Sequence, residues 1–119
     1  MKVIINKTYL HPEYAPEWER PMISKLIDLC LEAGGSVTVH DSEEFILEKC
    51  SDKLEIITNL ATSGEDTISV HDKAGECYGW FLLIYNNGSE GDPMIVIADH
   101  SDNEACGAIW NKLNDEFGE

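Results

Sequence analysis

ISVHDKAGECYGWFLLIY, residues Ile68 to Tyr85, decides the fold class of this chain. Ile68 and Val70 alternate with polar residues, as in a strand with one face in water. A glycine-containing turn follows at Lys73 to Glu76, and an apolar strand then returns over Cys77 to Tyr85. The stretch therefore predicts a β-hairpin whose second strand lies inside a sheet.

A similar hairpin precedes this one. Val37-Thr-Val-His-Asp41 nearly repeats Ile68-Ser-Val-His-Asp72, 31 residues apart, and a second strand returns over Phe45 to Lys49. Duplication of a hairpin-plus-helix unit would explain the repeat. Chance likeness between two strands of common composition explains it too, and both interpretations stay open.

Three segments carry apolar residues at helical spacing, with proline or capping residues at their starts. The expected starts are Pro21, then Ser51 or Asp52, then Ser101 with Glu104 three residues on, which is a capping-box pattern. Glycines at positions 34 and 64 end the first two. The expected inward residues are Met22, Ile23, Leu26, Ile27, Cys30 and Leu31; Leu54, Ile57, Leu60 and Ala61; and Cys106, Ile109, Trp110, Leu113 and Phe117.

Two further strands complete the prediction, over Lys2 to Asn6 and Met94 to Ala98, with an irregular arm from Tyr9 to Arg20. The order β-α-β-β-α-β-β-β-α predicts a single α+β domain over residues 1–119. It has a mainly antiparallel sheet of about six strands and three helices. The strands at Cys77 to Tyr85 and Met94 to Ala98 lack alternation, so both of their faces need cover. Three helices can cover one face; the arm, a second subunit or a partner must cover the other.

The charge of the chain bounds what it can touch. It has 23 acidic against 8 basic residues and a formal net charge of −15. A field this negative repels nucleic acid and anionic lipid, and it favours basic partners. Solubility alone explains the same charge equally well. The four cysteines form no Cys-x-x-Cys pair, and neither a signal peptide nor a membrane-length apolar run is visible, so we expect reduced core thiols in a cytoplasmic protein.

The carboxylates are spread through folded segments, where they can imitate a phosphate array. We therefore predict a non-enzymatic protein that binds a basic protein surface, such as a nucleic-acid-binding enzyme, without binding nucleic acid or membrane itself. The expected contacts are Asp41, Glu43, Glu44, Asp99 and Asp102. The alternatives are a small metal-dependent or thiol enzyme, and a structural homodimer.

Three histidines have an aspartate beside them near predicted strand ends: His40, His71 and His100. Converging imidazoles could bind zinc, but these strand ends need not share one edge, and His-Asp is ordinary turn chemistry. The acids of residues 99–104 are explained by helix capping. The chain has no Gly-x-Ser-x-Gly, His-Glu-x-x-His or glycine-rich phosphate loop. We therefore assign no catalytic residue, metal or cofactor.

Two segments carry a resemblance, Gly79-Trp-Phe-Leu-Leu-Ile84 and Ile97-Ala-Asp-His-Ser-Asp-Asn103. There the chain resembles small uncharacterised proteins carried by phages, plasmids and related bacterial elements. In those proteins, as in this chain, an aliphatic strand follows Gly-Trp, and an Asp-x-Ser-Asp-Asn segment then precedes a helix. The resemblance covers about a third of the chain. It implies a small α+β domain in a bacterial cytoplasm and brings no activity or site residue, although mobile elements do encode acidic inhibitors of restriction and CRISPR systems.

Overall fold

The computed structural model describes residues 3–5, 8–10, 15, 17–32, 35–41, 44–61, 64–86 and 93–118. Its elements are β1 (Val3–Ile5), β2 (Thr8–Leu10), η1 (Glu17–Glu19), α1 (Arg20–Leu31), β3 (Ser36–Asp41), β4 (Glu44–Cys50), α2 (Lys53–Thr58), β5 (Glu65–His71), β6 (Cys77–Ile84), η2 (Pro93–Val96), β7 (Ile97–His100) and α3 (Glu104–Phe117). The predicted α+β class and its three helices are confirmed.

The main sheet has five strands in the order β4-β3-β5-β6-β7, and every neighbouring pair is antiparallel. The predicted first strand pairs instead with β2, inside the segment expected to be an irregular arm, and forms a separate two-stranded sheet. The last strand also lies further along than predicted. Residues Pro93–Val96 form a 3₁₀ turn, for which the fixed φ of proline is suited at the first position, and β7 begins only at Ile97.

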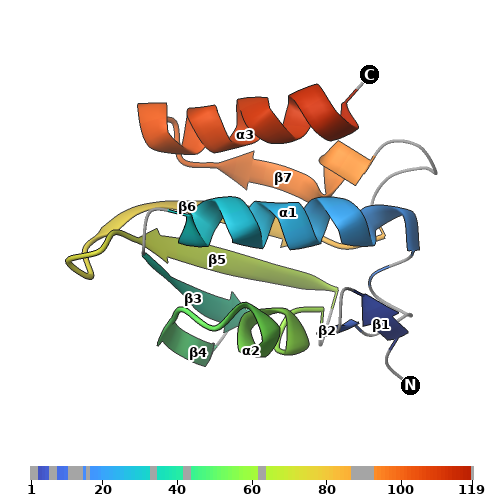
Figure 1. Cartoon of the computed structure of the whole chain (residues 1–119), viewed down its shortest axis with the longest axis horizontal. Helices are drawn as coiled ribbons and strands as arrows, with labels where there is room; N and C mark the ends of the chain where they lie inside the picture. The colour runs from blue at the N-terminus through green and yellow to red at the C-terminus, as the bar shows by residue number, and fades with distance from the viewer. Residues whose placement is uncertain are drawn as a thin grey trace.

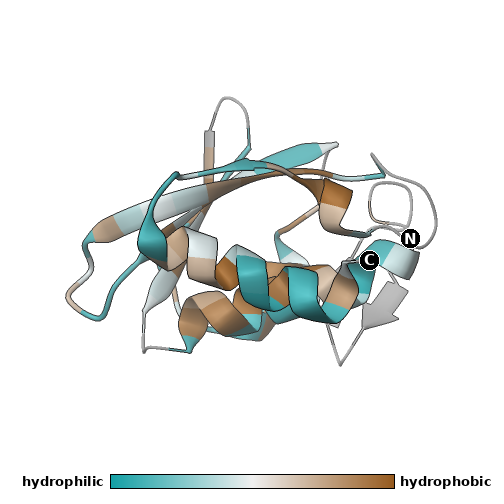
Figure 2. Ribbon diagram, turned by 90° about the horizontal axis from the view of Figure 1, so that it is seen from above, coloured by the Kyte–Doolittle hydropathy of each residue, from teal (hydrophilic) through white to brown (hydrophobic). Residues whose placement is uncertain are grey.

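The molecule has two layers. Figures 1 and 2 show α1, α2 and α3 on one side of the sheet, with α1 running between the other two helices. Within the described residues no helix lies against the opposite side of the sheet. We call these the covered face and the open face. The expectation that both faces of the central strands are covered is therefore not met by the described helices and strands.

The covered face is entirely apolar at its centre. Its strand residues are Val37, Val39, Ile68, Val70, Phe81 and Leu83, each fully buried. The α1 residues Met22, Ile23, Leu26 and Ile27 are fully buried as well. This is the expected result of a period of two in the strands and about 3.6 in the helix, since each element then turns one apolar side inward.

The two repeated pentapeptides lie side by side, because β3 and β5 are neighbours. Val37 pairs with Val70, Thr38 with Ser69 and Val39 with Ile68. The repeat therefore forms a local two-fold arrangement around the Thr38–Ser69 pair. It places apolar residues on the covered face and short hydroxyl side chains on the open face.

Helix capping agrees with the sequence in α2 and differs in α3. Asp52 is the cap of α2, one of the two residues predicted for it, and its carboxylate accepts the Leu54 N–H at 3.0 Å. The cap of α3 is Asn103, whose side chain accepts the Cys106 N–H at 2.8 Å, and the predicted cap Ser101 is wrong. The Ser101 hydroxyl instead accepts the Trp80 N–H at 2.9 Å. The Ser101 hydroxyl thus bonds to a residue of the neighbouring strand and not to the first turn of α3.

Two expectations about inward residues are wrong. Leu54 is 47% exposed, because α2 is only six residues long and buries Ile56 and Ile57 instead. All four cysteines are free, but only Cys30 and Cys106 are core thiols. Cys77 is exposed and Cys50 half-buried.

One carboxyl group lies inside the apolar layer. Asp66 is 1% exposed, and its Oδ2 accepts the Ala61 N–H at 2.9 Å and the Tyr85 hydroxyl at 2.7 Å. Its Oδ1 has no hydrogen-bond partner. Burial raises the pKa of this carboxyl from 3.8 to about 6, against the lowering effect of the two hydrogen bonds. The core therefore contains a proton-binding group.

Among the described residues, no helix is both long enough and apolar enough to cross a membrane.

Candidate functional site

The open face displays two aromatic side chains. Phe45 is 64% exposed and Trp80 is 37% exposed, whereas large apolar residues normally lie inside. The Phe45 ring packs against the His40 ring, with centroids 4.8 Å apart. Trp80 is held through its backbone, because its N–H donates to Ser101 Oγ and its carbonyl accepts the Ser101 N–H at 3.0 Å. The sheet therefore presents flat π surfaces on a rigid frame.

A buried polar group lies between these aromatic residues in the strand order. The Thr38 hydroxyl accepts the Lys49 N–H at 3.0 Å and is 2.8 Å from His71 Nε2. A hydroxyl can accept two hydrogen bonds and donate one, so this contact fits either tautomer of the His71 ring. His71 is 8% exposed and its Nδ1 has no partner. A hollow of about 260 Å³ lies here, lined by Thr38, Phe45, Glu48, Lys49, Ser69, His71 and Cys77.

Carboxylates surround the open face. Glu65 pairs with Ile84 and Asp99 with Leu82, and the alternation of the strands directs all four side chains to this face. Glu48 is exposed on the edge strand β4 and lines the hollow. Lys49 is the cation nearest to it in sequence. Aromatic rings flanked by carboxylates form a surface that favours arginine and lysine, through cation–π contacts and ion pairs.

The five carboxylates predicted from sequence do not gather in one place. Asp41 follows the alternation of Val37 and Val39 toward the covered face, and it raises the pKa of nearby Asp66. Asp99 lies on the open face of β7, three strand spacings away, or about 14 Å at the usual separation of strands.

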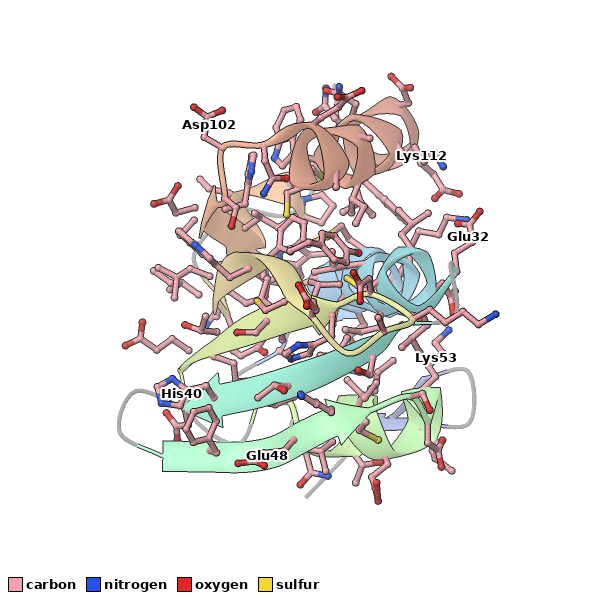
Figure 3. The ribbon with its side chains drawn as sticks, turned by 90° about the vertical axis from the view of Figure 1, so that its left-hand side faces the viewer. Glu32, His40, Glu48, Lys53, Asp102 and Lys112 are labelled. Atoms are coloured by element: carbon pink, nitrogen blue, oxygen red, sulfur yellow. The ribbon has the colours of Figure 1, made fainter. Side chains whose placement is uncertain are left out.

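The remaining predicted contacts are Asp102, Glu43 and Glu44. Figure 3 shows Asp102 and Glu48 at opposite edges of the molecule. Asp102 is exposed in the segment that joins β7 to α3. Glu43 lies outside the described residues, and Glu44 is described only by its backbone, which pairs with Asp41.

The three histidines also remain apart. His40 and His71 share the open face, but their register places them four residues apart along the strands, or about 13 Å. His100 lies on the covered side, with its ring centroid 5.8 Å from that of Phe81 and 6.4 Å from that of Trp110. The described residues contain no group of three side chains that could hold a metal ion.

Cys77 lies opposite His71 in the β5–β6 register, which is the closest approach of a thiol to an imidazole that the pairing gives. The thiol donates to the Gly79 carbonyl at 3.4 Å, and His71 Nδ1 is unpartnered. Thiol activation requires a hydrogen bond to the base. These two residues form none.

A cleft of about 520 Å³ opens at one end of the sheet, between the end of α1, the first half of α3 and the β5–β6 turn. Its apolar lining is Leu29, Cys30, Ala105, Ala108 and Ile109, and its polar lining includes Glu32, His71, Asp72, Tyr78 and Lys112. Burial raises the pKa of Tyr78 to about 12. It also raises the pKa of the Cys30 thiol well above its ordinary value. Both groups therefore stay protonated at neutral pH. We call this the end cleft.

Neither the exposed aromatics nor the end cleft was predicted from sequence. The sequence around Trp80 does contain part of the information needed to predict its exposure. Gly79 and Phe81 point toward the covered face, so Trp80 between them points toward the open face. No local pattern in the sequence indicates the end cleft, because its walls come from segments far apart in the chain.

No protein-family model, curated protein sequence or solved structure matches this chain.

Proposed function

We propose that this protein is a non-enzymatic binding protein whose open face docks a basic protein surface. The observation that carries the proposal is the exposure of Phe45 and Trp80 on a sheet face that no described helix covers, with Glu48, Glu65 and Asp99 around them. Arginine and lysine can stack on the rings and pair with the carboxylates, and the net charge of −15 attracts such a partner over distance.

The partner class that we propose is a nucleic-acid-binding enzyme. Nucleic acid also presents flat rings among anionic groups, and proteins bind single strands by stacking on the rings and neutralising the phosphates. An open face with aromatic rings and carboxylates offers the same two kinds of contact. The protein would then act as an inhibitor that occupies the nucleic-acid site, a role consistent with the resemblance to proteins of mobile elements.

Of the sequence-predicted contacts, we retain Asp99 and Asp102, which are exposed at the β7 side of the sheet. Asp41 lies in β3 and Glu44 in β4, on the far side of the sheet from β7, and Glu43 lies outside the described residues. We treat those three as a separate set, to be neutralised independently.

The test compares two triple variants with equal loss of charge. One carries Glu48→Gln, Glu65→Gln and Asp99→Asn on the open face. The control carries Glu55→Gln, Asp115→Asn and Glu116→Gln, which are exposed on α2 and α3. Tagged wild type and both variants are incubated with host lysate at low and high salt, and retained proteins are identified by mass spectrometry.

The proposal expects wild type and control to retain the same nucleic-acid-binding proteins at low salt, and the open-face triple to lose them. Neutralising three contacts should weaken affinity by about ten-fold or more, since each close charge pair contributes up to about 1 kcal/mol. A single-stranded oligonucleotide should displace the partner. Equal retention by all three proteins would overturn the assignment of the open face.

A second copy of the chain is the competing occupant of this face. Sedimentation velocity over a range of concentrations distinguishes the two. A dimer that dissociates when Trp80→Ser is introduced would assign the open face to self-association and would overturn the basic-partner proposal.

A further inference from the structure

The end cleft has the dimensions of a small-molecule site. Its volume of about 520 Å³ lies within the range of roughly 300–1,000 Å³ typical of ligand pockets. Ala105 and Ala108 line it from α3 beside Ile109 and Lys112, so part of this wall has methyl groups where larger side chains would narrow the cleft. Its lining is mainly apolar, with a few polar groups, which is the usual composition of a pocket that binds an apolar molecule in one orientation.

Charges of both signs line the cleft without pairing. Glu32 follows the last turn of α1, Lys112 lies on α3, and Figure 3 shows both on the same side of the molecule. Neither is in a salt bridge with any residue of the described chain. The other carboxylate, Asp72, already accepts the Ala74 and Glu76 N–H groups at 3.0 Å within its turn. Lys25, Asp115 and Glu116 line a neighbouring hollow with these two residues, but none of them forms a salt bridge with either one, so both charges remain available to a ligand.

The helix ends strengthen the negative side. α1 has no basic residue in its last turn, so the partial negative charge of its C-terminal carbonyls adds to that of Glu32. An ammonium group is favoured there. On the other wall, Lys112 favours a carboxylate.

We infer that the end cleft binds an apolar α-amino acid, with its ammonium at Glu32, its carboxylate at Lys112, and its side chain against Leu29, Ala108 and Ile109. None of these five residues belongs to the open face. The inference is therefore independent of the proposed function, and either can fail without the other.

Three probes that share one ring system separate the contribution of the ligand's ammonium group from that of its carboxylate. L-Tryptophan carries both charged groups, tryptamine lacks the carboxylate, and indole-3-propionate lacks the ammonium. Each is titrated into ¹⁵N-labelled full-length protein while the backbone amide signals are followed. We expect saturable shifts at Tyr78 and Ala108, and affinity for L-tryptophan about five-fold above that for either analogue, as for partly exposed ion pairs.

Two variants assign each charged group. Lys112→Gln should weaken L-tryptophan binding about five-fold and leave tryptamine unchanged, whereas Glu32→Gln should weaken L-tryptophan and leave indole-3-propionate unchanged. Lys73→Gln and Glu55→Gln are the controls of matched charge, at exposed positions that do not line the cleft. Ala108→Leu, on an exposed helical position, should abolish binding of all three probes without loss of folding.

Several results would overturn the inference. One is the absence of a saturable shift with L-tryptophan, and another is binding of the analogues as tight as that of L-tryptophan. Equal weakening of all probes by the cleft variants and by their controls would likewise remove the assigned roles of Glu32 and Lys112.

Discussion

The two faces of the central sheet are built by the same strands and differ in burial. Phe81 is fully buried on the covered face, whereas its neighbour Trp80 is 37% exposed on the open face. Val70 is fully buried, and its neighbour Ser69 lies on the open face. A strand with a period of two can therefore stabilise the fold with one set of residues and present a recognition surface with the other.

The largest expected difference between the faces is at this neighbouring pair. Phe81→Ala should lower the free energy of unfolding by about 3–5 kcal/mol, because it removes a buried ring and leaves a cavity. Trp80→Ala should lower it by about 1 kcal/mol, since part of the ring is already in water. Urea denaturation followed by circular dichroism measures both. Similar losses for the two variants would mean that the open face also contributes a core.

A smaller effect is expected from Asp66, the carboxyl group on the covered face. Its pKa is about 6 in the folded protein and 3.8 ordinarily, so the folded state holds the proton longer as pH rises. Stability should therefore fall between about pH 4 and pH 6, by up to about 3 kcal/mol from this group. Below pH 4 both states are protonated, and the contribution disappears.

Asp66→Asn tests this prediction, because the carboxamide oxygen can still accept bonds from Tyr85 and Ala61. Urea midpoints at pH 4, 5, 6 and 7 should fall less steeply in the variant than in wild type. Parallel profiles would show that Asp66 does not titrate in this window. Glu76→Gln, which removes an exposed carboxylate just before β6, is the matched control and should leave the profile unchanged.

The smallest expected effect on stability is at Phe45. Phe45→Ser should change the free energy of unfolding by less than about 0.5 kcal/mol, since the side chain is 64% exposed. The affinity of the Phe45→Ser variant for the captured basic partner should nevertheless be about five-fold lower than that of wild type, because a cation–π contact is lost. Loss of stability with unchanged affinity would reverse the roles that we assign to the two faces.

Local signals predicted most of the framework. Helical spacing located α1 between its proline and glycine signals, and residue type limited the cap of α2 to Ser51 or Asp52, of which the structure has Asp52. Predictions failed where a distant partner competed. Ser101 caps no helix because its hydroxyl is taken by Trp80, and the first strand joins a separate hairpin because Thr8–Leu10 offers a nearer partner than the main sheet.

The candidate sites were less accessible to sequence reasoning. Acidic composition indicated a basic partner, but it gave no means of choosing among 23 carboxylates. Asp99 reaches the open face and Asp41 points toward the covered one because of strand parity and register. The end cleft depends on the packing of α3 beside α1, which brings Lys112 and Glu32 to one cavity from positions eighty residues apart.

The sequence by itself determined the charge of this protein, its helices and hairpins, and the alternation that gives each strand two different sides. These properties are local, since they depend on residue type and on spacing over a few positions. Tertiary structure alone decided which side is covered, which carboxylates share a face, and where a cavity remains. Those outcomes depend on pairing and packing between segments that have no contact along the chain.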